Sequence, residues 1–431
     1  MRIIADLQIH SKYSRACSKD LTPKNINFWA QKKGVGVIGT GDFTHPKWLF
    51  ELKENLIEEK PGLYKFQSPE ESLLGERRLS SGTYFMLTAE VSSIYKQGDK
   101  VRRVHNMIFA PNFGAVDRII KGLEKVGANL KSDGRPIMGV HCDTLVKIVK
   151  EADEYAEVIP AHVWTPHFGL FGSLSGFNSV EEAFGDQSKY IKAIETGLSS
   201  DPKMNWQISG LDKYSLTSNS DAHSLRKIGR EANVFEISSD KLSYAEIISV
   251  LYSKNPKEFL YTIEFFPEEG KYHLDGHMDC KFSCLPEKTK ELAGICPVCG
   301  KKLLVGVLSR VADLSDRAYG YKSKRAVPFK SVIPLEEVIA ETLGVGVISK
   351  KVTAMYENMV RRASEFAILL DLKQKEIAQI SSENIAQAVM RVRNGQVTVK
   401  GGYDGKFGEI HIYDEVEKER LTGKAKQQGL F

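Results

Sequence analysis

The chain of 431 residues is 42% hydrophobic and 27% charged, which is typical of globular proteins. Its length suits two or three domains, and no apolar run approaches the roughly 20 residues needed to cross a bilayer. The first residues lack the apolar stretch of a secretory signal, so we expect a cytoplasmic protein without membrane contacts. Lys and Arg number 60 against 55 Asp and Glu, and the excess lies after residue 300, where we expect a polyanion to bind.

Residues 1–265 alternate short apolar runs, rich in β-branched side chains, with stretches of helical periodicity. This alternation predicts an α/β fold built from βα units, and nine runs favour a closed barrel over a small open sheet. The predicted strands are 3–9, 35–43, 84–92, 104–109, 136–140, 158–163, 193–197, 216–220 and 234–237. The predicted helices between them are 25–33, 46–56, 115–126, 144–152, 180–184 and 244–253.

The composition changes after residue 265, which predicts a small second domain at 266–320 and a basic, mainly helical third domain at 321–431. In the third domain, apolar residues recur at helical spacing in 335–343, 350–372 and 384–393. Two short runs, 397–399 and 409–412, are joined by a glycine-rich segment and predict a hairpin.

Histidines and carboxylates stand at or near the ends of several predicted strands. Because the βα loops of a barrel open on one face, these side chains can meet there. Neutral imidazoles and carboxylates could then hold two or three divalent ions, zinc, manganese or magnesium, that hydrolyse a phosphoester. A single histidine of this kind would more often be a core residue with a satisfied hydrogen bond. The candidate ligands are His10, Asp42, His45, Glu90, His105, His162, Asp221 and His223.

The segments that carry these residues resemble the polymerase-and-histidinol-phosphatase (PHP) domain. The matching segments are Asp-Leu-Gln-Ile-His-Ser at 6–11, Thr-Gly-Asp at 40–42 with His45 after it, Glu90, His105, Pro-Ala-His at 160–162 and Ser-Asp-Ala-His at 220–223. The resemblance implies a distorted (β/α)7 barrel with a site for three metal ions.

The same resemblance implies a role for each ligand. Glu90 would bridge metal ions, and Asp42 competes with His45 as the ligand of the second segment. Gln8 stands where the family has a histidine, and an amide oxygen is a weak metal ligand, so two ions or three remain open. The implied ligand pairs are Asp221 with His10, His105 with His162, and His45 with His223.

Three carboxylates are the expected catalytic groups: Glu90, Asp221 and Glu195. Glu195 lies in the predicted strand 193–197. It could be a metal ligand, a partner that orients a ligand from behind, or a general base.

Four cysteines fall within twenty residues in the spacing Cys-x3-Cys-x11-Cys-x2-Cys. Clustered cysteines in a cytoplasmic chain indicate a metal site rather than disulfides. Four thiolates close a tetrahedral zinc site and leave no position for water, so this zinc should be structural. His277 could substitute for one thiolate. The predicted zinc ligands are Cys280, Cys284, Cys296 and Cys299.

Two basic segments of the C-terminal part are candidates for contact with nucleic acid. In the first, basic residues alternate with aromatic ones that could stack on bases, although a solvated loop would look the same. In the second, glycines, a hydroxyl and lysines precede a predicted helix, whose free amides could hold a phosphate. The first comprises Arg317, Tyr319, Tyr321, Lys322, Lys324 and Arg325, and the second comprises Gly344, Gly346, Ser349, Lys350 and Lys351. The end of the chain, 427–431 (Gln427 to Phe431), could bind a sliding clamp or be a disordered tail.

Considered together, the barrel segments, the cysteine cluster and the basic third resemble the endonuclease Q family. That resemblance implies a metal-dependent endonuclease that cuts DNA on the 5′ side of uracil, hypoxanthine, xanthine or an abasic site. The expected partner is therefore single- or double-stranded DNA with deaminated bases, and the mechanism is base flipping with metal-activated water. The base would enter a pocket formed by aromatic residues after His162, or these residues are core instead. They are Trp164, Phe168, Phe171 and Phe177.

Two other functions fit part of the pattern. A small-molecule phosphatase, acting on histidinol phosphate or a nucleotide, would use the same metal site but leave the cysteine cluster and basic segments without a role. A DNA-binding protein whose barrel has lost catalysis is the other alternative, which Gln8 makes worth testing.

Overall fold

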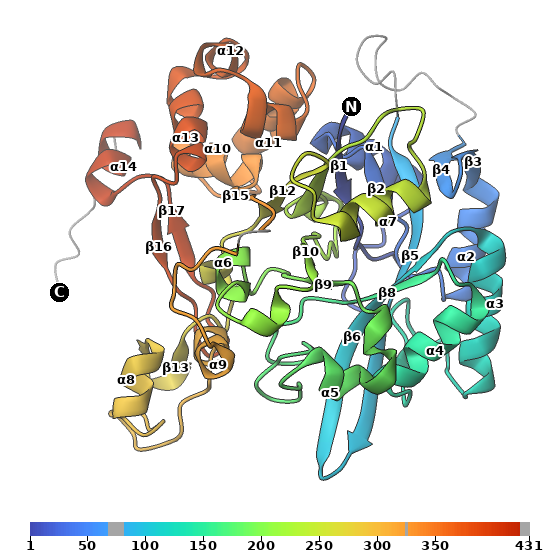
Figure 1. Cartoon of the computed structure of the whole chain (residues 1–431). Helices are drawn as coiled ribbons and strands as arrows, with labels where there is room; N and C mark the ends of the chain where they lie inside the picture. Colours follow the sequence, from blue (N-terminus) through green and yellow to red (C-terminus); the bar gives the residue numbers. More distant parts are fainter. Residues whose placement is uncertain (68–81, 324–325, 423–431) are drawn as a thin grey trace.

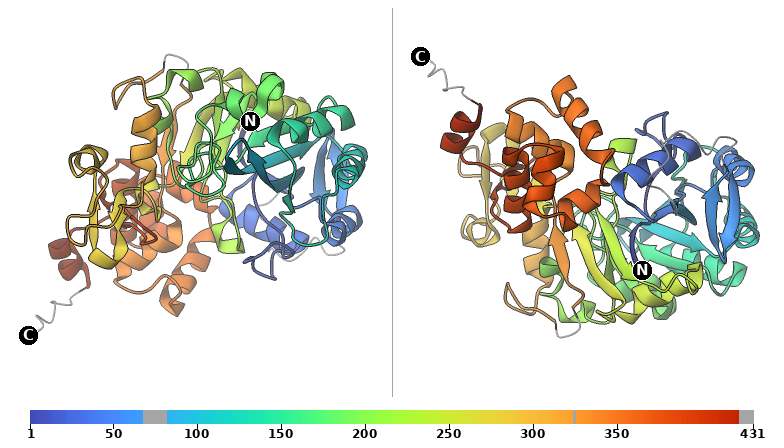
Figure 2. Two further views of the ribbon diagram at one scale, coloured as in Figure 1. Left: turned by 90° about the horizontal axis from the view of Figure 1, so that it is seen from below. Right: turned by 90° about the horizontal axis from the view of Figure 1, so that it is seen from above.

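The computed structural model describes residues 1–67, 82–323 and 326–422. A long mixed sheet with helices around it forms the N-terminal body, and a helical region follows at the C-terminal side (Figure 1). In both views of Figure 2, the orange and red C-terminal helices lie to one side of the blue-to-green body. The predicted α/β class with a helical C-terminal region is therefore confirmed.

Eleven strands pair into the main sheet, in which the long β5–β6 hairpin extends beyond its neighbours (Figure 1). Along the sheet the order is β15-β12-β11-β1-β2-β5-β4-β3, with β6 and β7 pairing with β5, and β8 with β6. The strands are β1 (Arg2–Asp6), β2 (Val37–Gly39), β3 (Leu56–Lys60), β4 (Leu63–Phe66), β5 (Tyr84–Gln97), β6 (Lys100–Ala110), β7 (Ile137–Met138), β8 (Glu157–Pro160), β11 (Ala232–Glu236), β12 (Phe259–Glu264) and β15 (Phe329–Ser331).

Each of the nine predicted runs supplies a strand, but a closed seven-stranded barrel is not confirmed. The runs around residues 193 and 216 form β9 (Ala193–Glu195) and β10 (Ser215–Thr217), which pair only with each other among the described strands. A few hydrogen bonds, several of them involving side chains, link this pair to its neighbours instead of a ladder. Val163 N–H donates to the Glu195 carbonyl (3.0 Å), and Ser218 N–H donates to the Asn233 side chain (3.0 Å). The strand ends therefore still converge around one space.

The predicted helices of this body are confirmed, and they cover the sheet with one apolar face. In α3 (Phe113–Lys125), Ala115, Val116, Ile119 and Leu123 are buried, and the Asn112 side chain caps the helix by accepting from Ala115 N–H (2.9 Å). The other helices are α1 (Pro23–Lys33), α2 (Pro46–Asn55), α4 (Cys142–Ala152), α5 (Val180–Phe184), α6 (Pro202–Asn205) and α7 (Tyr244–Ser253).

The segment with the cysteines forms a small unit of short elements in yellow at the lower left of Figure 1. Its hairpin pairs β13 (Asp275–His277) with β14 (Phe282–Cys284), and α8 (Pro286–Glu291) and α9 (Val307–Leu314) follow. The chain after residue 320 then begins by adding β15 to the main sheet, parallel to β12. The domain limits at residues 265 and 320 remain a prediction.

The C-terminal helices pack around their own apolar core. The predicted helix at 350–372 is wrong in length, because α11 ends at Val360 and the chain turns to bury Glu365. The Glu365 carboxylate accepts from Tyr356 Oη (2.8 Å) and pairs with Lys33 of α1 at 2.6 Å, which ties this region to the body. The elements are α10 (Leu335–Leu343), α11 (Lys350–Val360), α12 (Gln374–Ile380), α13 (Glu383–Arg393), β16 (Thr398–Lys400), β17 (Glu409–His411) and α14 (Glu415–Thr422). The predicted hairpin is confirmed as β16–β17.

No helix within the described ranges combines the length and the apolar character that spanning a membrane requires.

Candidate metal centres

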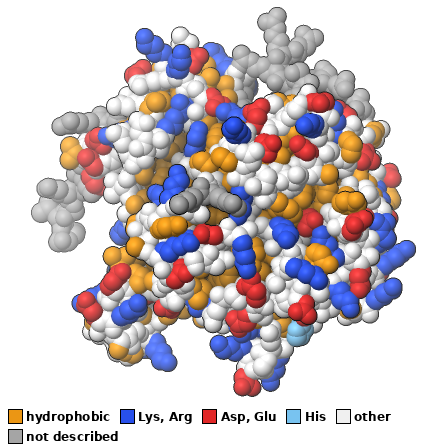
Figure 3. All heavy atoms as spheres, viewed as in Figure 1, with side chains coloured by type: hydrophobic (Ala, Val, Ile, Leu, Met, Phe, Trp, Pro, Cys, Tyr) orange, Lys and Arg blue, Asp and Glu red, His pale blue; other side chains and the backbone are white. Residues whose placement is uncertain are grey.

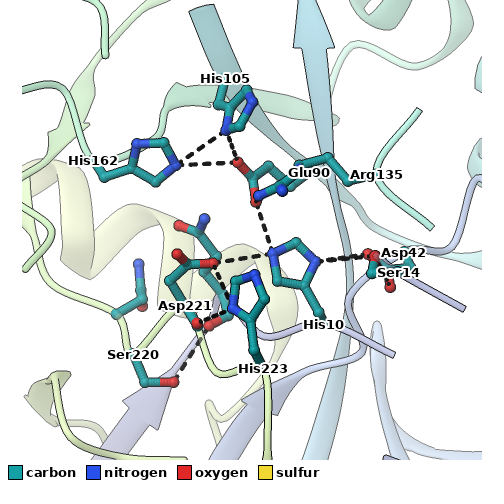
Figure 4. A network of polar contacts seen from close by, with 12 residues as sticks. His10, Ser14, Asp42, Glu90, His105, Arg135, His162, Ser220, Asp221 and His223 are labelled. Carbon is teal, nitrogen blue, oxygen red and sulfur yellow. Dashed lines mark hydrogen bonds and ion pairs between the residues drawn. The ribbon is translucent and has the colours of Figure 1, made fainter. Parts of the chain in front are cut away.

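His10 lies at the centre of a buried polar network beyond the end of β1 (Figure 4). Its Nε2 atom is 3.0 Å from Asp221 Oδ1 and 3.0 Å from Glu90 Oε2. Its Nδ1 atom is 3.1 Å from Asp42 Oδ1 on the other side of the ring. One histidine thus links carboxylates from three separate parts of the chain.

The ligand atoms form two groups in which all atoms lie within 4.8 Å of one another. The first contains His10, Asp221 and His223, and the second contains Glu90, His105 and His162. Glu90 Oε1 is 2.6 Å from His105 Nδ1 and 3.1 Å from His162 Nε2, while its Oε2 faces His10. Glu90 therefore lies between two positions that could each hold a divalent ion.

The predicted third pair, His45 with His223, is not brought together, because His223 belongs to the His10 group. His45 stacks on Tyr13 with ring centroids 4.5 Å apart, and its buried Nδ1 has no hydrogen-bond partner in the described part of the chain. Neither Asp42 nor His45 is a member of the two groups of close ligand atoms, and the choice between them as ligand remains a prediction.

Asp42 instead orients His10 from behind. Its Oδ2 accepts from Ser11 N–H (2.6 Å) and from the hydroxyls of Ser11 (2.6 Å) and Ser14 (2.8 Å), while its Oδ1 faces His10 Nδ1. A carboxylate at one ring nitrogen directs the other nitrogen toward a metal and makes it more basic. This geometry favours a positioning role for Asp42 in the first group.

The donor atoms suit divalent metal ions. Imidazoles and carboxylates are ligands of zinc and manganese, and each group combines both types. Gln8 is fully buried, and within the described ranges neither its amide oxygen nor its nitrogen has a hydrogen-bond partner. An unpaired buried amide costs about 1–3 kcal/mol, which a bound cation at its oxygen would offset.

The carboxylates of the network are held in the ionised form that metal binding needs. Burial alone would raise the pKa of Glu90, but Arg135 and the neighbouring histidines outweigh it and hold that pKa well below the usual carboxyl range. Burial is likewise outweighed at Asp221, where His10 lowers the pKa to about 2. Of the two histidines that contact Glu90, burial lowers the pKa of His105 to about 4, whereas for His162 the hydrogen bond to Glu90 outweighs burial and raises it to about 8.

Glu195 lies behind the second group rather than in it. Its Oε2 accepts from His162 N–H (2.7 Å) and its Oε1 from the Asn219 amide (2.8 Å), so both oxygens are used. The bond to His162 supports a left-handed backbone at that residue (φ 29°). Of the three roles considered for Glu195, this geometry favours the partner that orients a ligand.

The site residues Asp42 (φ 51°) and Asp221 (φ 47°) are also left-handed. Such conformations are uncommon for residues other than glycine and persist where surrounding contacts enforce them. Here the left-handed backbone lets the side chains of Asp42 and Asp221 point from turns after strands toward His10.

A cavity of about 200 Å³ opens beside the two groups. It brings in Arg135 and Thr165, which the strand-end pattern does not identify because they lie in loops. It also includes His167, which the sequence places near the same rim as a residue that could touch a substrate phosphate. Phe168 also lines it and stacks on His105, with ring centroids 4.5 Å apart. The lining residues are His105, Arg135, His162, Thr165, His167, Phe168, Gly197, Leu198, Asp221 and His223.

The other predicted base-pocket residues are core. Trp164, Phe171 and Phe177 are each 1% exposed, and Trp164 Nε1 donates to Asn205 (2.8 Å). Core packing, the alternative weighed for this aromatic set, therefore holds for these three. Phe168 remains the candidate to contact a base.

Glu264, at the end of β12, is a fully buried carboxylate outside the ligand groups. Burial raises its pKa from the ordinary 4.5 to about 8, although hydroxyls of Thr262 and Thr196 donate to it. Because the folded pKa lies above the unfolded one, the folded state keeps a proton that the unfolded state releases between pH 4.5 and 8. This group therefore lowers the stability of the fold as pH rises through that window.

Glu264→Gln is accordingly expected to leave the stability almost unchanged near pH 4.5 and to increase it toward pH 8, by up to about 5 kcal/mol. Urea unfolding at a series of pH values measures this, with the exposed Glu54→Gln as control. Parallel stability curves for Glu264→Gln and the parent would contradict a raised pKa at this carboxyl.

In the cysteine segment, the grouped ligand atoms belong to Cys280, Cys296, Cys299 and His277. His277 Nδ1 lies 3.7 Å from Cys299 Sγ, whereas Cys284 Sγ lies 3.2 Å from the Thr289 hydroxyl. The four-cysteine set predicted from spacing thus differs by one member. In the hairpin, His277 pairs with Phe282, and Cys284 lies two residues, about 7 Å, further along the strand.

Cys284→Ser is therefore expected to keep one zinc ion per chain at this site, while Cys296→Ser and His277→Ala lose it and melt at lower temperature. Elemental analysis and thermal melts of the purified variants test this. Equal zinc loss in Cys284→Ser and Cys296→Ser would show that Cys284 is the ligand.

The first basic segment is partly engaged with the body. The Arg317 guanidinium forms two hydrogen bonds with the Asp212 carboxylate (2.9 and 2.7 Å) and lies 4.2 Å from the centre of the Tyr321 ring. Tyr319 is 75% exposed and Lys322 is also exposed. Lys324 and Arg325 lie outside the described residues.

The second basic segment forms the predicted helix start. Gly344, with φ 62°, ends α10, and the Ser349 hydroxyl caps α11 by accepting from Val352 N–H (3.3 Å). Gly346, Lys350 and Lys351 are exposed around this turn. The predicted clamp-binding tail, 427–431, lies outside the described residues.

Comparison with known proteins places this architecture in a family. The chain is 28% identical to the Bacillus subtilis protein YqxK over 422 residues, which cover 95% of this chain and 99% of YqxK. All of it superposes on the lesion-specific endonuclease PfuEndoQ from Pyrococcus furiosus, with 30% identity, a TM-score of 0.83 and 98% of that chain covered. The chain belongs to the endonuclease Q family.

A second endonuclease Q structure is equally similar, with 31% identity, a TM-score of 0.82 and complete coverage of both chains. That endonuclease Q is in complex with a 27-mer duplex substrate that has an abasic lesion at the active site. The MJ0043 C-terminal domain, a family model, matches residues 334–396, which contain α10 to α13 and the turn capped by Ser349.

Proposed function

We propose that this protein is a metal-dependent DNA endonuclease that hydrolyses the phosphodiester on the 5′ side of deaminated bases (uracil, hypoxanthine, xanthine) and abasic sites. The observation that carries the proposal is Glu90, which lies between two ligand groups, and His105, His162, Asp221 and His223 of those groups line a cavity. Full-length similarity to endonuclease Q structures supports DNA as the substrate.

Two divalent ions, one in each ligand group, would polarise the phosphate and lower the pKa of the attacking water. His10, Asp221 and His223 would hold one ion, and the Glu90 group the other. Asp42 fixes His10, and Glu195 fixes His162, before substrate arrives. The water oxygen forms a bond to phosphorus, the bond from phosphorus to O3′ breaks, and the departing oxygen takes a proton. The products are a 3′-hydroxyl and a 5′-phosphate.

The nucleotide at the lesion would leave the helix to bring the phosphate into the cavity. Extrusion costs a few kcal/mol, and least at a mispaired or missing base, which supplies part of the selectivity. Phe168 stacks on His105 at the cavity wall and is our candidate to contact the displaced nucleotide.

The wider DNA contact would involve the exposed residues of the two basic segments, Tyr319 and Lys322 in one and Lys350 and Lys351 in the other. On the face seen in Figure 3, Lys and Arg are interspersed with Asp and Glu rather than gathered in one patch. Each neutralised phosphate makes binding more dependent on salt.

One experiment that compares three substrates distinguishes the endonuclease, the phosphatase and the silent DNA-binding protein. Protein loaded with manganese or zinc is incubated with a duplex that has one abasic site, with an undamaged duplex, and with histidinol phosphate. The proposal expects rapid nicking of the damaged duplex alone. Phosphate release from histidinol phosphate without nicking would favour the phosphatase, and tight DNA binding without either reaction would favour a silent DNA-binding protein.

We also propose that the protein is cytoplasmic and that residues 427–431 bind a sliding clamp. The tail would bring the enzyme to replicating DNA, and deletion of these residues should then abolish clamp binding without changing nicking of short duplexes.

A further inference from the structure

Arg135 places a positive charge inside the candidate active site. Its Nη1 lies 3.4 Å from Glu90 Oε2, on the oxygen that also faces His10 (Figure 4). The side chain is 24% exposed and lines the cavity beside His105 and Asp221. No ligand role was predicted for this residue, and an arginine cannot bind a metal ion.

The loop that carries Arg135 is fixed on both sides. Gly134 N–H donates to the Tyr13 carbonyl (3.1 Å), and the carbonyl of Pro136 accepts from Ser92 N–H in β5 (3.0 Å). A side chain at 134 is excluded, because a Cβ there would lie 2.4 Å from both Asp42 Oδ2 and Ser14 Oγ. The guanidinium is therefore positioned by backbone contacts with the same elements that hold the ligands.

The guanidinium has unused hydrogen-bond donors. Glu90 is its hydrogen-bond partner within the described ranges, through Nη1 alone, although an arginine side chain offers five N–H groups. By contrast, Arg118 on α3 pairs with Asp153 (2.6 Å) and with the Ala152 carbonyl (2.6 Å). The remaining donors of Arg135 are therefore available to a ligand in the cavity.

The charge of the site indicates what that ligand is. Three carboxylates, Asp42, Glu90 and Asp221, surround His10, and Arg135 offsets one of their charges. With two divalent ions bound, the site would carry a net positive charge, which attracts an anion. Planar guanidinium donors match two oxygens of a phosphate group.

We propose that Arg135 binds non-bridging oxygens of the phosphodiester. The site would then work with two metal ions and one guanidinium, without the third metal ion that the family resemblance left open. This inference rests on the proposed function for the nature of the substrate, but phosphate binding can be tested separately. Arg135 would hold the phosphate in line and stabilise the charge that develops on its oxygens.

The test compares Arg135→Gln and Arg135→Lys with the parent and with the surface control Arg118→Gln. Three quantities are measured on metal-loaded protein: metal ions per chain, affinity for inorganic phosphate by calorimetry, and kcat and KM for nicking of an abasic duplex. A charge-assisted hydrogen bond is worth about 1.5–3 kcal/mol, or roughly 10- to 150-fold.

Arg135→Gln is expected to keep the parent's metal content, to bind phosphate at least about 10-fold more weakly and to lower kcat by at least about 10-fold. Arg135→Lys keeps the charge and should fall between Arg135→Gln and the parent, and Arg118→Gln should match the parent. Unchanged phosphate affinity in Arg135→Gln would overturn the inference, and so would loss of metal ions, which would make Arg135 a support for Glu90. If the parent binds phosphate through Arg135 but nicks no damaged DNA, the proposed function fails and this inference stands.

Discussion

Glu90→Gln is expected to lower kcat for nicking of lesion-containing DNA by at least about 1000-fold. Glu90 faces His105 and His162 through one oxygen and His10 through the other, at 2.6, 3.1 and 3.0 Å. An amide keeps the shape of the side chain but removes its charge and one acceptor. Metal binding should therefore weaken at both positions together. A loss of about 4 kcal/mol of transition-state stabilisation corresponds to that factor.

Single-turnover nicking with saturating protein separates this effect from weakened DNA binding. Glu151→Gln is a matched control, because Glu151 is 66% exposed on α4 and pairs only loosely with Lys147 (3.9 Å). DNA affinity should change little in either variant. Nicking by Glu90→Gln at the rate of Glu151→Gln would show that the two ligand groups do not perform the chemistry.

Removing the divalent ions with a chelator is expected to reduce nicking to background, and adding manganese or zinc to restore it. Water at neutral pH is a poor nucleophile until a cation lowers its pKa from 15.7 to about 7. Bound ions would also offset the negative charge of the buried carboxylates of Glu90 and Asp221, which repel each other when metal leaves. The metal-free protein should therefore also melt at lower temperature.

Elemental analysis of the reloaded protein should give two ions per chain beyond the zinc of the cysteine segment. Cys296→Ser, which lacks the expected zinc, identifies the ions of the nicking site separately. A third ion at the His10 network would contradict the two-group geometry, and full activity of demonstrably metal-free protein would contradict metal-dependent chemistry altogether.

Much of the body could be predicted from local pattern. All nine apolar runs became strands, because continuous β-branched stretches such as Ile3–Ile4 in β1 are buried within the sheet. Barrel closure could not be predicted, since it depends on how β9 and β10 meet their neighbours. There, hydrogen bonds to side chains, such as that from Ser218 N–H to Asn233, replace a continuous ladder.

Within the site, the pattern of polar residues at strand ends identified all six members of the two ligand groups. It could not separate the members of these groups from Asp42, because Asp42 and His10 follow strands in the same way. Only the three-dimensional arrangement shows that Asp42 faces the far nitrogen of His10. Arg135 was missed because its position depends on a loop fixed by Gly134, not on any strand.

Spacing also has limited power in the cysteine segment and after His162. The cysteine spacing alone does not show that the hairpin places His277 beside Cys299 and Cys284 beside Thr289. Of the aromatic residues predicted for the base pocket, Phe168 lines the cavity, whereas Trp164 and Phe171 pack inward. Whether an aromatic residue in a loop packs inward depends on the backbone path of that loop.

The central claim is tested most directly by mapping the cut on an end-labelled duplex with one deoxyuridine, hypoxanthine or abasic site at a known position. Metal-loaded protein is expected to give a single product that ends in a 3′-hydroxyl at the bond 5′ to the lesion, with no product from the undamaged duplex or with Glu90→Gln. Equal cutting of damaged and undamaged strands, or no cutting with manganese, zinc or magnesium, would contradict the account.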